Sequence, residues 1–213
     1  MGVLAHSDRV WTSDSNDALD RQVIQRGASF SLPLEVLGCH IGPAKCHVTG
    51  RRLSMEMRAA TAFMGHMGLE LNLLTERTAD LDVLKNAIDL HKKHRALLHN
   101  GDVFRLDSAP QLIASGVIAR DKSEAIYSVA YVASDAKVLP GRFQFTGLDP
   151  QRSYRLQLIW PSDWQAIKGP SAIETLDLNG EGAIFSGAAL VHGGLQLPHA
   201  FPETCLLFYV AAV

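Results

Sequence analysis

Residues 100–110 read NGDVFRLDSAP, and the hydrophobic pattern of the chain changes across this stretch. Before it, short apolar runs alternate with stretches of helical period, at residues 9–12, 18–25, 35–37, 53–64, 68–73 and 81–98. Such an alternation of strand and helix predicts a layer of parallel strands covered by helices. We therefore expect residues 1–107 to form one domain and residues 108–213 to form another.

After the boundary the apolar period shortens to two residues, which is the period of a strand. Strands are predicted at residues 125–132, 142–145, 154–160 and 203–210. Turn sequences such as Asn179-Gly180 and Gly193-Gly194 separate them, and no clear pattern of helix length interrupts them. The second domain is therefore predicted to be an antiparallel β-sandwich.

The clearest helix is expected at residues 81–98. Thr78 precedes it as an N-cap, and Asn100-Gly101 follows it as a C-cap. Basic side chains gather near its carboxyl end, where cations suit the helix dipole. We interpret His91 and His94 as part of this solvated last turn and not as metal ligands.

The composition excludes several classes of protein. An apolar share of 47% excludes a disordered chain, and a net charge of −2 without a long basic run argues against nucleic acid as a partner. No apolar stretch approaches the roughly 18 residues that would span a bilayer, so no membrane partner is expected. The three cysteines are too few for a disulfide framework, which favours a reducing compartment, the cytoplasm.

The first domain holds too few units for a closed barrel. A (β/α)8 barrel takes eight strand–helix units and about 250 residues, whereas this chain has three such units. The predicted fold is therefore α/β followed by all-β: a partial (β/α)8 TIM barrel, as the carboxyl-terminal piece of something larger, and then the β-sandwich.

The densest polar cluster follows the first expected strand and reads WTSDSNDALDR, residues 11–21. Catalytic groups of parallel α/β layers sit at the carboxyl ends of strands, which is where Asp14 is expected. Trp11 beside it is typical of a site that grips the apolar face of a sugar ring. The spacing leaves open an alternative, in which one of residues 13–16 caps the following helix.

Two further side chains are candidates for the same rim. His40 ends the second expected strand and would face the pocket of a barrel. Arg51 lies at the start of the next helical stretch, where its guanidinium can donate to hydroxyls or pair with an acid. The dipeptides Cys39-His40 and Cys46-His47 match no standard zinc spacing, so no metal site is expected.

The segment WTSDSNDALDRQVIQRG, residues 11–27, resembles the acid/base segment of the α-galactosidases of glycoside hydrolase family 36. The similarity continues through residues 37–42, 49–51, 68–73, 100–106 and 194–198. It implies a catalytic barrel, of which the last three units are here, followed by an antiparallel β-domain. It also implies a small galactoside such as melibiose or raffinose as substrate, hydrolysed with retention of configuration and without a metal or organic cofactor.

The resemblance implies roles for individual residues. Asp14 matches the general acid/base, Trp11 and Ser13 match its immediate neighbours, and Asp17 matches a second acid of the motif with a structural role. The family's nucleophilic aspartate lies in a Lys-Trp-Asp type of segment that does not occur in this chain. Because a retaining mechanism needs a second carboxyl about 5 to 5.5 Å from the first, we expect this chain by itself to be inactive.

Two expectations concern association and binding without catalysis. The strand edges of a partial barrel invite self-association, so a homo-oligomer is expected. In an alternative interpretation, the second domain is a non-catalytic oligomerisation or carbohydrate-binding module that stacks sugars on Tyr131, Trp160 and Trp164.

Overall fold

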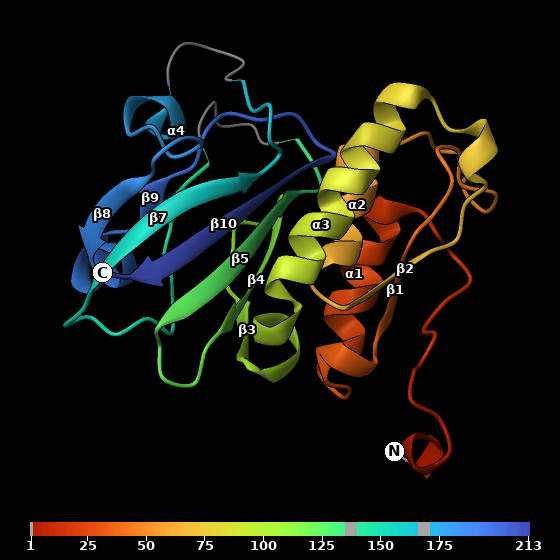
Figure 1. The fold of residues 1–213 in the computed structure, drawn as a ribbon, viewed down its shortest axis with the longest axis horizontal. Coiled ribbons are helices and arrows are strands. Elements are labelled where there is room, and N and C mark those ends of the chain that lie inside the picture. Colours follow the sequence, from red (N-terminus) through yellow and green to blue (C-terminus); the bar gives the residue numbers. More distant parts are fainter. Residues whose placement is uncertain (1, 135–139, 166–170) are drawn as a thin grey trace. The chain divides into compact units, whose positions relative to one another are not determined.

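The computed structural model describes residues 2–134, 140–165 and 171–213, which form two compact units (Figure 1). The first unit comprises Met1–His99 and the second Asn100–Val213. In the part of the chain that is described, no helix combines the length and the apolar character that crossing a bilayer requires.

The first unit alternates helices with short parallel strands. Strands β1 (Gly38–Ile41) and β2 (His66–Leu69) pair in parallel, and Val10 forms an isolated parallel bridge to Leu37. Three α-helices, α1 (Ala18–Ala28), α2 (Met55–Phe63) and α3 (Thr78–Asn100), follow these three segments in turn, together with 3-10 turns at Gly2–Ala5, Leu34–Val36 and Leu73–Thr75. The predicted order of extended segment and helix is therefore confirmed.

The expected strands at 9–12, 35–37 and 68–73 are shorter or displaced. Residues 9–12 contribute the Val10 bridge alone, and Leu34–Val36 form a 3-10 turn behind Pro33, so that strand β1 begins at Gly38. The turn closes because Val36 N–H donates to the Pro33 carbonyl. Apolar residues in a tight turn had the same pattern as a short buried strand.

Helix α2 is buried on nearly every side. Three of its positions are alanines, Ala59, Ala60 and Ala62, which allow neighbouring backbones to come close. On the side of α1, Gln22 donates to the Thr61 hydroxyl (2.9 Å) and Gln25 to the Thr61 carbonyl (2.8 Å). A helix of this kind belongs inside a packed layer rather than at a surface.

Helix α3 corrects the interpretation of its histidines. His91 and His94 are buried, with 8% and 5% of their surface exposed, because they continue the apolar face of Leu84, Ala87 and Leu98 at helical spacing. The Nδ1 atom of His91 lies 3.1 Å from the Phe63 carbonyl oxygen. The expectation of a solvated last turn is wrong at these two positions, since spacing decides the face that a residue takes.

The second unit is built on a six-stranded antiparallel sheet, which confirms the antiparallel β-structure. The strand order is β3-β4-β5-β10-β7-β8, and a separate pair, β6-β9, forms a two-stranded sheet. The bounds are β3 (Asp102–Leu106), β4 (Leu112–Ile118), β5 (Glu124–Tyr131), β6 (Arg142–Phe143), β7 (Ser153–Trp160), β8 (Ala183–Ser186), β9 (Leu195–Gln196) and β10 (Thr204–Ala212), with a short helix α4 (Ala172–Thr175) and a π-type turn at Ala189–Gly193.

The boundary between the units lies between His99 and Asn100 and not at the expected position after residue 107. Strand β3 pairs with β4 from Asp102↔Ile118 to Leu106↔Ala114, so residues 102–106 belong to the second unit. The stretch that marks the change of pattern is thus itself the first strand of the sheet.

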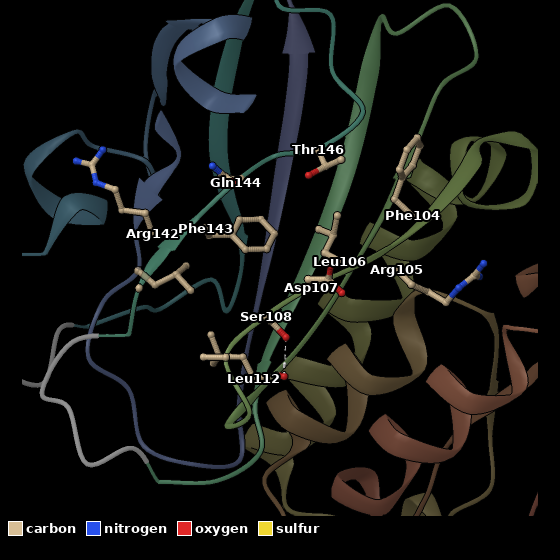
Figure 2. Close-up of a pocket in the computed structure, with 13 residues that line it drawn as sticks. Phe104, Arg105, Leu106, Asp107, Ser108, Leu112, Arg142, Phe143, Gln144 and Thr146 are labelled. Carbon is tan, nitrogen blue, oxygen red and sulfur yellow. Dashed lines mark hydrogen bonds between the residues drawn. The ribbon is translucent and has the colours of Figure 1, made fainter. Parts of the chain in front are cut away.

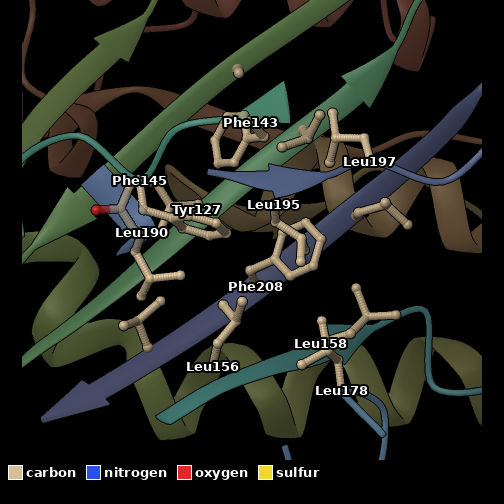
Figure 3. Close-up of a cluster of buried hydrophobic side chains, with 14 of the residues drawn as sticks. Tyr127, Phe143, Phe145, Leu156, Leu158, Leu178, Leu190, Leu195, Leu197 and Phe208 are labelled. Atoms are coloured by element: carbon tan, nitrogen blue, oxygen red, sulfur yellow. The ribbon is translucent and has the colours of Figure 1, made fainter. Parts of the chain in front are cut away.

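The core of the second unit lies between the large sheet and the β6-β9 pair (Figure 3). Tyr127 and Phe208 of the large sheet meet Phe143 and Phe145 in edge-to-face contacts, with ring centroids 5.0 to 6.0 Å apart. Leu195 and Leu197 close the cluster from the strand β9 side. In the described residues the second layer is therefore two strands wide, narrower than that of a full sandwich.

The three aromatic residues considered for sugar stacking belong to the interior. Tyr131, Trp160 and Trp164 are 3%, 3% and 8% exposed. The Tyr131 hydroxyl donates to the Pro198 carbonyl (2.8 Å), and Trp164 Nε1 donates to Glu174 (2.8 Å). Stacking on a ligand needs an exposed ring face, so these residues do not form a carbohydrate platform.

The buried imidazole of His91 gives the chain a pH-dependent stability. Burial lowers the pKa of His91 from 6.5 to about 4. Between these values the unfolded chain binds the proton and the folded chain does not, so stability is full above pH 6.5 and falls as the pH drops. We expect the free energy of unfolding in urea to fall by about 2 kcal/mol from pH 7 to pH 5 through this residue.

The matched comparison is His91→Gln, which keeps a donor near Phe63 but does not titrate in this range. The variant should lose about 2 kcal/mol less than the original chain over the same interval. His6→Gln, at an exposed position, serves as the control and should change nothing. Equal pH dependence in all three proteins would contradict the assignment.

Candidate active site

The carboxyl ends of the parallel segments in the first unit bring three polar stretches together. The Val10 bridge leads into residues 11–17, β1 ends at Ile41 after His40, and β2 leads directly into Glu70. The Glu70 N–H donates to the Ile41 carbonyl (3.0 Å), which holds the two strand ends side by side. This edge is the one at which parallel α/β layers place their active sites.

Asp17, and none of residues 13–16, caps helix α1. Its carboxylate accepts from the backbone N–H groups of Leu19 (2.9 Å) and Asp20 (3.3 Å) and from the Thr49 hydroxyl. Arg51 adds an ion pair of 2.7 Å, and Asp17 is 1% exposed. Burial by itself would raise the pKa of Asp17, but these donors together lower the pKa below its ordinary value.

The carboxylate of Asp14 is not used as a cap, because Asp17 caps helix α1. Within the described residues its carboxylate takes part in no hydrogen bond or ion pair, and the residue is exposed. The local turn is closed instead by Ser13, whose hydroxyl accepts from the Ser15 N–H at 3.1 Å. Asp14 therefore lies exposed at this edge with its carboxylate uncommitted.

Trp11 is held by two protein groups. The ring of His40 stacks on it with centroids 4.3 Å apart and planes 28° from parallel. The Arg21 guanidinium also lies over the indole, at 4.3 Å from the ring centroid. These contacts use ring surface that a sugar would need, so at most the remaining part of the indole is open to a ligand.

Arg21 fastens this loop to strand β1, a role that the sequence did not reveal. The residue is 1% exposed, and its NH1 and NH2 groups donate to the carbonyls of Ser13 (3.1 Å) and Gly38 (2.8 Å). Burial lowers the pKa of Arg21, and the nearby Cys39 and Glu70 oppose that shift. The guanidinium is thus satisfied by carbonyl groups and an aromatic ring in place of a paired acid.

His40 lies next to the carboxyl end of strand β1, and Arg51 pairs with acids. The Nδ1 atom of His40 is 3.1 Å from a carboxylate oxygen of Glu70. Arg51 NH1 contacts both Asp17 (2.7 Å) and Asp20 (3.3 Å). A direct contact of Arg51 with substrate stays a prediction.

A second buried ion pair, absent from the sequence prediction, ties the loops together. Arg58 makes two contacts with the carboxylate of Glu76, at 3.1 and 2.9 Å, and donates to the Gly42 carbonyl at 2.8 Å. Both side chains are almost fully buried. The pair links α2 to the segments that follow β1 and β2, and such bidentate pairs fix geometry well.

A pocket of about 290 Å³ in the second unit is a weaker candidate (Figure 2). Several of its polar side chains already have partners: Ser108 donates to the Leu112 carbonyl (2.8 Å) and Gln144 to the His192 carbonyl (3.0 Å). Arg142 donates to the Gly193 carbonyl (3.1 Å), and Figure 2 shows its guanidinium directed away from the pocket. The pocket therefore offers few groups that could orient a ligand.

The N-cap formed by Asp17 is expected to contribute measurably to the free energy of unfolding. Asp17→Asn weakens the cap and leaves Arg51 without its shorter ion pair, so the free energy of unfolding at pH 7 should fall by about 2 kcal/mol. Asp20→Asn removes one longer, partly exposed ion pair and should cost less than about 0.5 kcal/mol. Urea titrations of the two variants measure the difference, and equal losses would contradict the role assigned to Asp17.

Two family models match the chain. The model described as Melibiase matches residues 1–101, and that of the glycosyl hydrolase family 36 C-terminal domain matches residues 112–205. The alpha-galactosidase of Escherichia coli is 38% identical over 208 residues, covering 96% of this chain and 29% of that protein. The bifunctional alpha-galactosidase/sucrose kinase AgaSK of Mediterraneibacter gnavus is 28% identical over 199 residues, covering 92% of this chain and 19% of that protein.

Solved structures are similar over the whole chain. The galactosidase domain of AgaSK has a TM-score of 0.83 at 27% identity and covers 100% of this chain and 27% of that one. A variant of the family 36 alpha-galactosidase AgaA of Geobacillus stearothermophilus, solved in complex with raffinose, has a TM-score of 0.83 at 25% identity with the same coverage. This chain spans less than a third of the length of each of these relatives. Since the two models account for nearly all of its residues, the chain belongs to glycosyl hydrolase family 36.

Proposed function

We propose that the first unit is part of a (β/α)8 barrel and that Asp14 is the general acid/base of α-galactoside hydrolysis in that barrel. Three parallel segments in chain order, each followed by a helix, support the barrel. The observation that carries the catalytic role is the free, exposed carboxylate of Asp14 at the carboxyl-terminal edge, beside an acid that is fully engaged in capping.

In the proposed reaction Asp14 acts twice. As a carboxylic acid it gives its proton to the glycosidic oxygen while the bond to the anomeric carbon breaks. As a carboxylate it then takes a proton from the water that releases the sugar, which returns it to its starting state. The substrates would be terminal α-galactosides, in line with the raffinose and stachyose complexes of the related AgaA variants.

Among the acids that the structure describes beside Asp14, none is a candidate for the second carboxyl of a retaining mechanism. Asp17 is buried in its cap, and Glu70 is bonded to His40. A nucleophile about 5 to 5.5 Å from Asp14 would therefore come from another part of a complete barrel. The 213-residue chain alone should release no galactose from an α-galactoside.

Trp11, Ser13 and His40 would line the galactose subsite around Asp14. Ser13 can still donate its hydroxyl, since in the turn it only accepts. The Nε2 atom of His40 has no hydrogen-bond partner among the described residues. The indole of Trp11 would present to the sugar the part that His40 and Arg21 leave uncovered.

We also infer self-association and a reducing compartment. Strand β2 pairs with β1 alone in the described part of the chain, and its last residue, Leu69, is exposed together with Leu73 and Leu74 in the segment that follows. The free, buried state of Cys39, Cys46 and Cys205 supports a reducing compartment such as the cytoplasm.

Light scattering after size-exclusion chromatography should give a mass of at least twice 23.2 kDa. Replacing Leu73 and Leu74 by serine should shift the chain toward the monomer, because that change removes exposed apolar surface. A strictly monomeric original chain would contradict the inference of self-association.

The catalytic role is tested in a chimera, in which this chain replaces the matching 208 residues of the Escherichia coli enzyme. The chimera should hydrolyse raffinose and an aryl α-galactoside with a good leaving group. Asp14→Asn should lower kcat/KM for raffinose at least about 1000-fold but affect the aryl substrate much less, because a good leaving group needs little protonation. Added azide should restore turnover of the aryl substrate by capturing the galactosyl-enzyme.

Asp82→Asn, at an exposed position of helix α3, is the matched control and should behave like the unmodified chimera. An inactive chimera that is folded, or an Asp14→Asn variant that loses both substrates equally, would overturn the assignment of Asp14 as acid/base.

A further inference from the structure

Glu70 contacts both flanks of the loop that carries Asp14. One oxygen of its carboxylate accepts from His40 Nδ1 at 3.1 Å, and the side chain of Asn16 is the second neighbour that favours the charged carboxylate. His40 in turn stacks on Trp11. Trp11 comes three residues before Asp14, and Asn16 comes two residues after it.

The imidazole of His40, which contacts both Glu70 and Trp11, occupies a space that Gly68 leaves open. His40 lies opposite Gly68 in the β1-β2 register. A Cβ atom at position 68 would come within 2.6 Å of His40 Cδ2 and 2.9 Å of Nε2, so only glycine leaves room for the ring. Packed between Trp11 and the Gly68 backbone and bonded through Nδ1, the ring has one orientation, with Nε2 as its unused nitrogen.

Asn16 is equally constrained on the other flank. It is 4% exposed and lies against Gly42, where an added Cβ would come within 2.7 Å of Asn16 Cβ. Burial raises the pKa of Glu70, but the neighbouring His40 and Asn16 side chains, together with the charge of His47, outweigh burial and lower the pKa overall. The carboxylate is therefore charged at neutral pH, where it accepts from His40 and lies beside Asn16.

We propose that Glu70 is a positioning residue for the reaction proposed above: through His40 and Trp11 on one side and Asn16 on the other, it sets the place of the Asp14 carboxylate. This inference rests on the assignment of Asp14 as acid/base. Glu70 itself neither attacks the sugar nor exchanges a proton with it. Its contribution lies in preorganisation, since a displacement of about 1 Å of a catalytic group can cost 100-fold in rate.

The first test uses the 213-residue chain and nuclear magnetic resonance. Glu70→Ala should shift the indole N–H resonance of Trp11 and the backbone amide resonance of Asp14 and should remove the Overhauser contacts between the Trp11 and His40 rings. Glu181→Ala, which removes an exposed carboxylate in the second unit, is the control and should leave these signals in place. Unchanged Trp11 and Asp14 signals in folded Glu70→Ala would overturn the proposal, whatever the chimera does.

The second test measures kinetics in the chimera. Glu70→Ala should lower kcat/KM for raffinose by about 10- to 100-fold and for the activated aryl galactoside by less than about threefold, the same dependence on leaving group that Asp14→Asn gives. In the Asp14→Asn background, Glu70→Ala should add no further loss for raffinose, because the group that it positions is gone. Glu70→Gln keeps the side-chain shape and serves where Glu70→Ala unfolds.

The two proposals fail in different ways. If Asp14→Asn shows no preference for good leaving groups, the acid/base assignment is wrong. If Asp14→Asn behaves as expected but the Glu70 variants lose both substrates equally or neither, Glu70 has a general structural role or none, and the positioning proposal is overturned.

Discussion

The first unit depends on how one buried carboxylate is satisfied. Asp17 collects two backbone donors of α1, a hydroxyl and a guanidinium, and so ties the start of the helix to the loop after β1. A buried acid without these partners would cost several kcal/mol. Because Asp17 does this, Asp14 three residues earlier stays out of the helix start. Two acids on one short segment thus differ in environment: Asp17 is buried in the cap, and Asp14 is exposed.

Periodicity identified the elements of the fold but not their limits. The helices α1, α2 and α3 lie where apolar spacing placed them, because a helical face must meet the layer beneath it. Strand β3 was missed because its five residues are mixed in polarity, and it is half exposed at the edge of the sheet. The basic residues next to His91 and His94 suggested a solvated turn for both histidines. Counting in steps of three and four from Leu84 places both on the buried face of α3.

The candidate site was predictable where it follows from strand ends. Asp14 and His40 could be placed because parallel strands end at a common edge. Arg21, Arg58 and Glu76 could not, because their partners lie 17 to 18 residues away in sequence and become neighbours only after packing. Glu70 did carry a signal: it directly follows β2 on the same edge as His40, so the rule that found one residue would have found the other.

The short junction between helix α3 and strand β3 restricts where insertions can be accepted during evolution. Helix α3 ends at Asn100 and β3 begins at Asp102, so Gly101 is all that separates a hydrogen-bonded helix from a hydrogen-bonded strand. An insertion here would break either the last helical turn or the first rung of a ladder. Gene fusions and module exchanges are therefore expected to spare this junction, so that the two units are inherited as a single block.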